Sequence, residues 1–126
     1  APWGELLSTR SQYLKAAGCL TDGSVRDVKR IRQMNFPVFA GNIGPLDSKH
    51  RGKLMWYDVP GKIHGVNVNS GDFIFGDVDG VVIVPRQITA EVVEKALQKV
   101  REENQVRGML ENGVSLAKAF EEHGIL

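Results

Sequence analysis

The densest polar cluster of the chain is the run Asp22-Gly23-Ser24-Val25-Arg26-Asp27. It follows a short apolar stretch and precedes helical spacing, so we expect it between a strand and a helix start. Ligands of parallel α/β sheets bind at such positions, where free backbone N–H groups favour anions. Asp27 could hold a hard divalent cation, and Arg26 could bind a carboxylate or a developing oxyanion. A structural alternative is that Ser24-x-x-Asp27 forms a capping box and that Arg26 is a solvated helix residue.

A second candidate is Gly4-Glu5-Leu6-Leu7, at the start of the first predicted helix. A glycine before a helix lets a ligand approach the first-turn N–H groups closely, which suits a carboxylate. Glu5 would lie at the same end of the sheet as Asp27 if both helices leave parallel strands there. The alternative is that Glu5 only complements the helix dipole.

Other polar residues carry weaker signals. Asp77-Val78-Asp79 is more typical of a turn between strands than of a carboxylate pair. The basic loop at residues 49–53 is expected to be solvated, although it could meet an anionic substrate. The three histidines of the chain lack metal-ligand spacing: His50, His64 and His123.

Hydrophobic spacing predicts the elements that must position these residues. Residues 4–17 have helical spacing, and residues 19–21 are a short buried strand that the Asp22-Gly23 turn signal would stop. Residues 24–34 return to helical spacing, and residues 36–40 form a second strand. This order predicts a compact βαβ unit with a parallel strand pair.

The remainder of the chain predicts a β-rich middle followed by helices. Residues 88–106 give the clearest helical stripe, and residues 115–122 predict a short last helix. Glycine-containing turns separate four short β-like runs, at residues 53–58, 63–68, 72–75 and 81–84.

Composition limits the classes of function. Sixteen basic and 15 acidic side chains give a net charge of +1, which removes the electrostatic argument for a nucleic-acid partner. No apolar run approaches the length of a membrane span, and no basic-then-apolar leader opens the sequence. The single cysteine excludes an internal disulfide. We therefore expect a soluble, cytoplasmic protein with neither a nucleic-acid nor a membrane partner.

Several of these motifs occur together in one known family. The segments are Trp3-Gly4-Glu5-Leu6-Leu7, Asp22-Gly23-Ser24-Val25-Arg26-Asp27, Gly71-Asp72, Asp77-Val78-Asp79-Gly80-Val81, Ser115-Leu116-Ala117 to Phe120, and His123-Gly124-Ile125-Leu126. Together they resemble the RraA-like family, which includes 4-hydroxy-4-methyl-2-oxoglutarate aldolases and the RraA regulators of ribonuclease E. The most specific element is an acid, twenty intervening residues and then Arg-Asp, here Glu5 and Arg26-Asp27. The best-known aldolases have Asp at the first position, so Glu5 is a departure.

The resemblance implies an α/β fold, an αββα sandwich of the swivelling β/β/α type. Residues 1–126 would be a single RraA-like domain, the C-terminal major part of the family domain without its N-terminal portion. A homotrimer or homohexamer is also implied.

The resemblance further implies a divalent-metal-dependent class II pyruvate aldolase. It would cleave 4-hydroxy-4-methyl-2-oxoglutarate-type substrates and decarboxylate oxaloacetate, both through a metal-bound pyruvate enolate. Asp27 would hold Mg²⁺ or Mn²⁺, Arg26 would neutralise the enolate, and Glu5 would position metal-bound waters. Backbone N–H groups of Gly4-Glu5-Leu6-Leu7 would bind the carboxylate of the 2-oxo acid. Two alternatives stay open: a non-catalytic protein-binding regulator of a ribonuclease, and a scaffold that retains the motif without using it.

Overall fold

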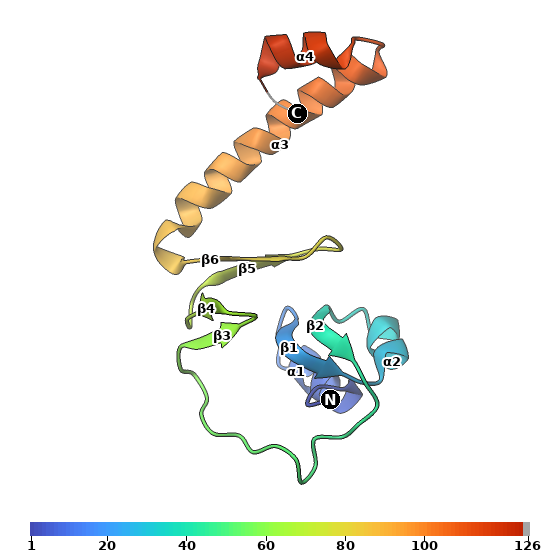
Figure 1. Cartoon of the computed structure of the whole chain (residues 1–126), viewed down its shortest axis with the longest axis vertical. Coiled ribbons are helices and arrows are strands. Elements are labelled where there is room, and N and C mark those ends of the chain that lie inside the picture. The colour runs from blue at the N-terminus through green and yellow to red at the C-terminus, as the bar shows by residue number, and fades with distance from the viewer. Residues whose placement is uncertain (125–126) are drawn as a thin grey trace. The chain divides into compact units, whose positions relative to one another are not determined.

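The structure is a computed structural model that describes residues 1–124. Ile125 and Leu126, which end the C-terminal motif, lie outside the described residues. The chain divides into two compact units, Ala1–Ile83 and Val84–Leu126 (Figure 1). The expectation of one domain over residues 1–126 stays a prediction.

The first unit begins with the predicted βαβ arrangement (Figure 1). β1 (Cys19–Val25) and β2 (Val38–Ile43) pair in parallel, and α2 (Val28–Gln33) connects them. α1 (Glu5–Tyr13) precedes β1 and is shorter than predicted, since the backbone turns left-handed at Lys15 (φ 65°). The parallel pair is confirmed, and it places the polar cluster at the carboxyl end of β1.

β1 continues through Asp22-Gly23, so the predicted turn there is wrong. Thr21 pairs with Ala40 and Ser24 pairs with Asn42, so β1 holds one residue more than β2 between these pairs. Such a bulge lets a strand absorb an Asp-Gly step without ending. Because the strand uses Ser24, the following helix begins at residue 28 and not at residue 24 as predicted.

The middle of the chain forms two short hairpin-like pairs. β3 (Gly61–Ile63) and β4 (Val66–Val68) are antiparallel, so the predicted single strand over residues 63–68 is wrong. β5 (Phe73–Gly76) and β6 (Val81–Val84) pair as a second two-stranded sheet.

The predicted strand over residues 53–58 is absent, and this stretch of the described chain has no regular structure. The side chains from Leu54 to Tyr57 are exposed, with 84% of Tyr57 accessible. A strand needs an apolar face or a paired neighbour, and these residues have neither burial nor a strand partner.

The core of the first unit is small. Its buried apolar side chains are Val25 of β1, Ile31 of α2 and Phe36, which precedes β2. Ser8 of α1 is also completely buried. The core therefore lies where the βαβ unit meets α1, and its residue Val25 directly precedes Arg26 of the polar cluster.

The second unit is a helical pair. A 3-10 turn, η1 (Arg86–Ile88), leads into α3 (Thr89–Glu111), which runs five residues beyond the predicted end. α4 (Leu116–His123) is close to its prediction, and the Ser115 hydroxyl caps it by accepting the Lys118 N–H. Across residues 1–124, no helix combines the length and apolar character that a membrane crossing requires. The two units together confirm the mixed α/β class.

Candidate functional site

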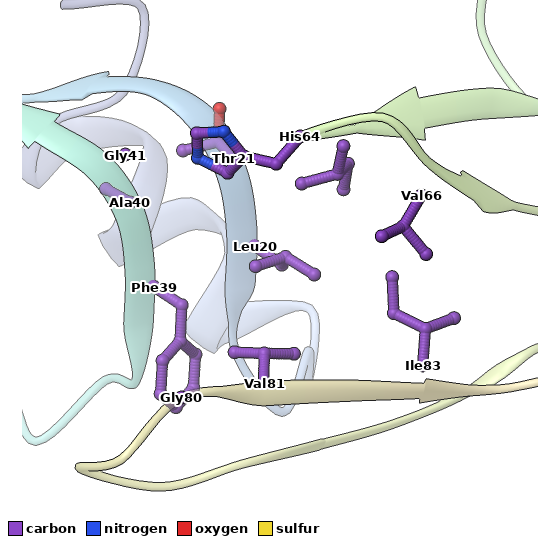
Figure 2. Close-up of a pocket in the computed structure, with 11 residues that line it drawn as sticks. Leu20, Thr21, Phe39, Ala40, Gly41, His64, Val66, Gly80, Val81 and Ile83 are labelled. Atoms are coloured by element: carbon purple, nitrogen blue, oxygen red, sulfur yellow. The ribbon is translucent and has the colours of Figure 1, made fainter.

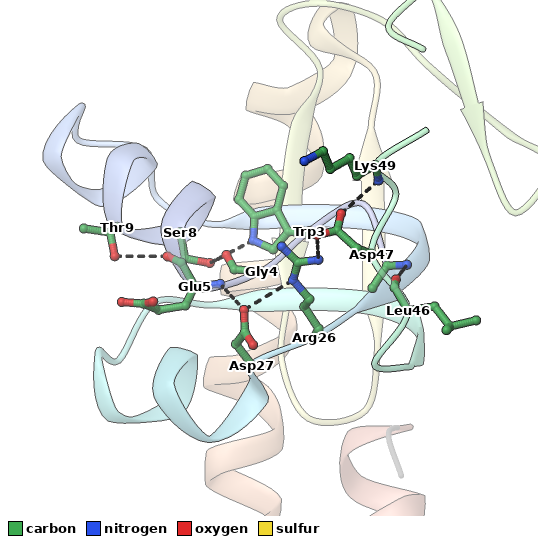
Figure 3. A network of polar contacts seen from close by, with 11 residues as sticks. Trp3, Gly4, Glu5, Ser8, Thr9, Arg26, Asp27, Leu46, Asp47 and Lys49 are labelled. Atoms are coloured by element: carbon green, nitrogen blue, oxygen red, sulfur yellow. Dashed lines mark hydrogen bonds and ion pairs between the residues drawn. The ribbon is translucent and has the colours of Figure 1, made fainter. Parts of the chain in front are cut away.

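The two polar motifs lie side by side in the first unit (Figure 3). Trp3 forms a parallel bridge with Val25 at the end of β1, and the Arg26 N–H donates to the Trp3 carbonyl at 2.9 Å. These backbone contacts hold Gly4 and the start of α1 next to Arg26. The structure therefore brings together Gly4, Glu5, Arg26 and Asp27, as the sequence predicted for their positions.

Asp27 caps α1 from 22 residues away. Its Oδ2 accepts the backbone N–H of Glu5 at 3.1 Å, while Gly4, the N-cap residue, has no side chain for this task. A carboxylate at a helix start satisfies a free N–H and complements the helix dipole. The capping-box alternative is wrong: Ser24 lies in β1, and Asp27 is itself the N-cap of α2, with no side-chain bond to that helix.

Arg26 contacts two carboxylates. Its Nε lies 3.5 Å from Oδ2 of Asp27, and its Nη1 lies 2.7 Å from Oδ2 of Asp47 (Figure 3). The hydrogen bond to Asp47 is the main cause that raises the pKa of the Arg26 guanidinium above its usual value. Arg26 is therefore a permanent cation, held between the start of α1 and the loop that follows β2.

Asp47 is held in turn by its own loop. Its Oδ1 accepts the Lys49 N–H at 2.9 Å. This backbone bond, followed by the bond from Arg26, lowers the pKa of the Asp47 carboxyl. Sequence analysis missed Asp47, because a lone aspartate in a loop of mixed charge carries no signal that it will reach Arg26.

Gly4 permits the close approach of the Arg26 and Asp27 side chains. A Cβ at this position would lie 2.7 Å from Oδ2 of Asp27 and 3.1 Å from Nε of Arg26. The backbone of Gly4 is extended (φ −162°), so any residue could adopt it. The glycine is required for space and not for conformation.

Ser8 anchors the segment that carries Gly4, and sequence analysis missed it as well. Its buried hydroxyl donates to the Gly4 carbonyl at 3.0 Å and accepts the Trp3 indole N–H at 2.8 Å. Buried groups that are fully hydrogen-bonded fix a unique geometry. A serine in a helix is too common to have indicated this role.

The start of α1 retains backbone donors. The intrahelical hydrogen bonds begin with the Ser8 N–H, which donates to the Gly4 carbonyl at 3.1 Å. The N–H groups of Leu6 and Leu7 therefore have no acceptor within the helix. They could bind an anion, as predicted, whereas the N–H of Glu5 is already engaged by Asp27.

The residues present fit a hard divalent cation through oxygen donors. Both contacts of Asp27 use Oδ2, which leaves Oδ1 for a cation. Within residues 1–124 no group of three or more His, Cys, Asp or Glu side chains could hold a metal ion. Mg²⁺ needs no such cage, because it commonly uses one or two carboxylates and keeps several waters. Three carboxylates (Glu5, Asp27 and Asp47) against one guanidinium leave a net charge of −2, which a divalent cation would balance.

A separate cavity of about 320 Å³ lies elsewhere in the first unit (Figure 2). Its lining is mostly apolar, with His64 and Thr21 among the few polar side chains. The residues around it include neither Glu5 nor the Arg26-Asp27 pair. The cavity is therefore separate from the polar cluster at the start of α1.

Comparisons with known proteins agree with the motif resemblance. Residues 1–83 match the family model described as RraA-like: Aldolase/RraA. Protein DlpA of Legionella pneumophila is 34% identical over 121 residues, which cover 96% of this chain and 20% of that protein. A 4-hydroxy-4-methyl-2-oxoglutarate aldolase of Thermus thermophilus is 36% identical over 69 residues, 55% of this chain and 42% of the enzyme.

A solved structure shares the fold. The crystal structure of an uncharacterized protein from Pseudomonas syringae has a TM-score of 0.89 at 29% identity, over 93% of this chain and 58% of that one. The chain spans about half the length of most curated relatives that it matches. The family match covers the whole first unit, including every residue of the candidate site, and the chain therefore belongs to the RraA-like family.

Proposed function

We propose that the protein is a divalent-metal-dependent aldolase and decarboxylase that releases pyruvate from small 2-oxo acids. The substrate classes are 4-hydroxy-4-methyl-2-oxoglutarate-type acids and oxaloacetate. Family membership and the named Thermus aldolase support this proposal. The observation that carries it is the meeting of Arg26 and Asp27 at the start of α1, beside free backbone donors.

The proposed reactions share one anionic intermediate. In the aldol cleavage the C4 hydroxyl loses its proton, the C3–C4 bond breaks, and its electron pair passes to the 2-oxo oxygen as pyruvate enolate. In oxaloacetate decarboxylation, loss of CO₂ leaves the same enolate. Protonation at carbon then yields pyruvate. Arg26 would stabilise the enolate oxygen, because a fixed cation aimed at developing charge lowers the barrier.

The remaining residues would bind substrate and move the proton. The N–H groups of Leu6 and Leu7 would bind the carboxylate at the pyruvate end. Mg²⁺ or Mn²⁺, held by Asp27, would polarise the 2-oxo and carboxylate oxygens when bound. The Glu5 carboxylate would hold water near Asp27, and this water would carry the proton.

The proposal extends to the assembly. We place the chain in an αββα sandwich of the swivelling β/β/α type, assembled as a homotrimer or homohexamer in the cytoplasm. The mixed α/β order of elements and the family match support this placement. Sedimentation of the chain at several concentrations tests the oligomer directly.

The deciding experiment measures pyruvate release with Mg²⁺ and with EDTA, from oxaloacetate and from 4-hydroxy-4-methyl-2-oxoglutarate. Decarboxylation by free metal alone is subtracted. We expect metal-dependent release that Asp27→Asn abolishes. Asparagine keeps the left-handed backbone of Asp27 (φ 58°) at little cost, so this variant tests the charge and not the fold.

Asp58→Asn is the matched control, because Asp58 is a second aspartate with a left-handed backbone (φ 54°) and lies outside the site. It should retain full release. Unchanged metal-dependent turnover in Asp27→Asn would overturn the proposal. A folded, metal-loaded chain without turnover would also overturn it and would favour the ribonuclease regulator, which a pull-down with the ribonuclease tests.

A further inference from the structure

We infer that Asp47 is a positioning residue that orients the Arg26 guanidinium for the reaction. This inference rests on the proposed function. It concerns a loop residue that none of the motifs includes, and it depends on three contacts: Arg26 to Asp47, Arg26 to Asp27, and Asp47 to Lys49.

The two carboxylates engage different nitrogens of Arg26. Asp27 lies at Nε and Asp47 lies at Nη1. A single contact would leave the guanidinium free to swing about it, whereas two contacts through different nitrogens fix its plane. Neither contact uses Nη2, so the N–H groups of Nη2 remain for an oxygen of the substrate.

Asp47 is itself held for this task. Its Oδ1 accepts the Lys49 N–H at 2.9 Å, and its Oδ2 accepts from Arg26 at 2.7 Å (Figure 3). Each oxygen of Asp47 therefore has a separate partner. The turn at residues 47–49 holds Oδ1 and so directs Oδ2 toward Arg26. The pKa of the Asp47 carboxyl is lowered, so the group is ionised at neutral pH.

Asp47 is well placed to orient Arg26 and poorly placed to stabilise the fold. Both side chains are partly exposed, and exposed ion pairs contribute little to stability. The shorter contact of Arg26 is the one to Asp47, so the loss of Asp47 leaves only the 3.5 Å contact to Asp27. Loss of Asp47 should then affect the rate of reaction much more than the unfolding transition.

The test is Asp47→Asn, which keeps the side-chain oxygen for the Lys49 N–H and removes the charge. Asp77→Asn is the matched control, because Asp77 accepts the N–H of Asp79 in the same type of turn at 2.8 Å. We expect kcat for pyruvate release to fall about tenfold to a hundredfold in Asp47→Asn, with a smaller change in KM, since small displacements of a catalytic group have effects of this size. The control should keep wild-type kcat.

A double-mutant cycle separates positioning from a general structural effect. In an Arg26→Lys background, Asp47→Asn should have no further effect on kcat, because the group that it orients is gone. Wild-type kcat in Asp47→Asn, or losses that simply multiply in the double variant, would overturn the inference.

An NMR measurement keeps the inference separate from the proposed function. The Nε–H resonance of Arg26 should shift and exchange faster with water in Asp47→Asn and stay unchanged in Asp77→Asn. An unchanged resonance in Asp47→Asn would overturn the positioning role whatever the activity. Absence of turnover in the wild-type chain would overturn the proposed function alone, while the resonance would still decide whether Asp47 orders Arg26.

Discussion

Asp27 joins an unusual backbone to two side-chain contacts. Its φ of 58° is left-handed, a conformation that aspartate and asparagine tolerate and that costs most other residues about 1–2 kcal/mol. Its carboxylate accepts the Glu5 N–H at the start of α1 and also contacts the Arg26 guanidinium. An alanine at this position would therefore combine backbone strain with loss of charge, and its effect on activity would have two causes.

At the same scale, Gly4→Ala is expected to disable the site without unfolding the chain. The new methyl would lie 2.7 Å from Oδ2 of Asp27 and would displace that carboxylate from the Glu5 N–H. Pyruvate release should fall by about tenfold or more, as for other displaced catalytic groups. The melting temperature should fall by only a few degrees, because the loss of stability is confined to the cap of α1 and alanine readily adopts the extended backbone of Gly4.

Gly44→Ala provides the control for Gly4→Ala. A Cβ at position 44 would meet its nearest neighbour, the Cβ of Ser24, at 3.8 Å, an ordinary contact. This variant should keep both its activity and its melting temperature. Full activity in Gly4→Ala would show that the close approach at position 4 is not needed for the reaction.

The ion pair between Arg26 and Asp47 should survive mild acid. The pKa of Asp47 in the folded chain lies below its usual value of 3.8, first because its carboxylate accepts the Lys49 N–H and second because of the bond from Arg26, so these contacts add a small stabilisation above that pH. This contribution is lost as the pH falls through the lowered pKa of the folded state. An NMR titration of the Asp47 carboxyl should show ionisation down to pH 4. A midpoint above 3.8 would contradict the contact.

Among the elements, β1 shows what local sequence could and could not predict. Apolar spacing predicted the parallel βαβ unit, because burial of apolar side chains determines which residues form its strands and helix. The same spacing placed the polar cluster between a strand and a helix. Asp22-Gly23 is typical of a turn, yet pairing of the following residues with β2 and Trp3 carries the strand to Val25. Asp47 was beyond prediction, since its contact with Arg26 joins positions far apart in the chain through a loop without periodicity.

The hairpin of β3 and β4 allows a matched test of backbone conformation. Its two-residue loop, His64-Gly65, has positive φ at both positions (47° and 82°). Gly65→Ala should lower the free energy of unfolding by about 1–2 kcal/mol, because alanine resists a left-handed backbone. Gly61→Ala is the control: a Cβ there also meets open space, and φ is not left-handed. Urea denaturation compares the two, and equal stabilities would contradict the turn.

For the molecule as a whole, one exposed apolar segment offers a contact surface for the proposed assembly of copies. Four consecutive large side chains from Leu54 to Tyr57 are each at least 61% exposed, and the net charge is only +1. Exposed apolar patches commonly mark interaction sites, and a nearly neutral chain has little self-repulsion to oppose contact between copies. These features are consistent with the proposed homotrimer or homohexamer.

The bridge between Trp3 and Val25 also means that the site forms only when distant segments of the chain are brought together. Glu5 and Asp27 meet across 22 positions, and Asp47 reaches Arg26 from another loop. Closing such loops costs entropy that only the packed unit repays. A peptide with the sequence of residues 22–27 would carry both Arg26 and Asp27 but would lack the arrangement that joins them. The proposed chemistry therefore depends on the folded state and cannot be transferred as a short motif.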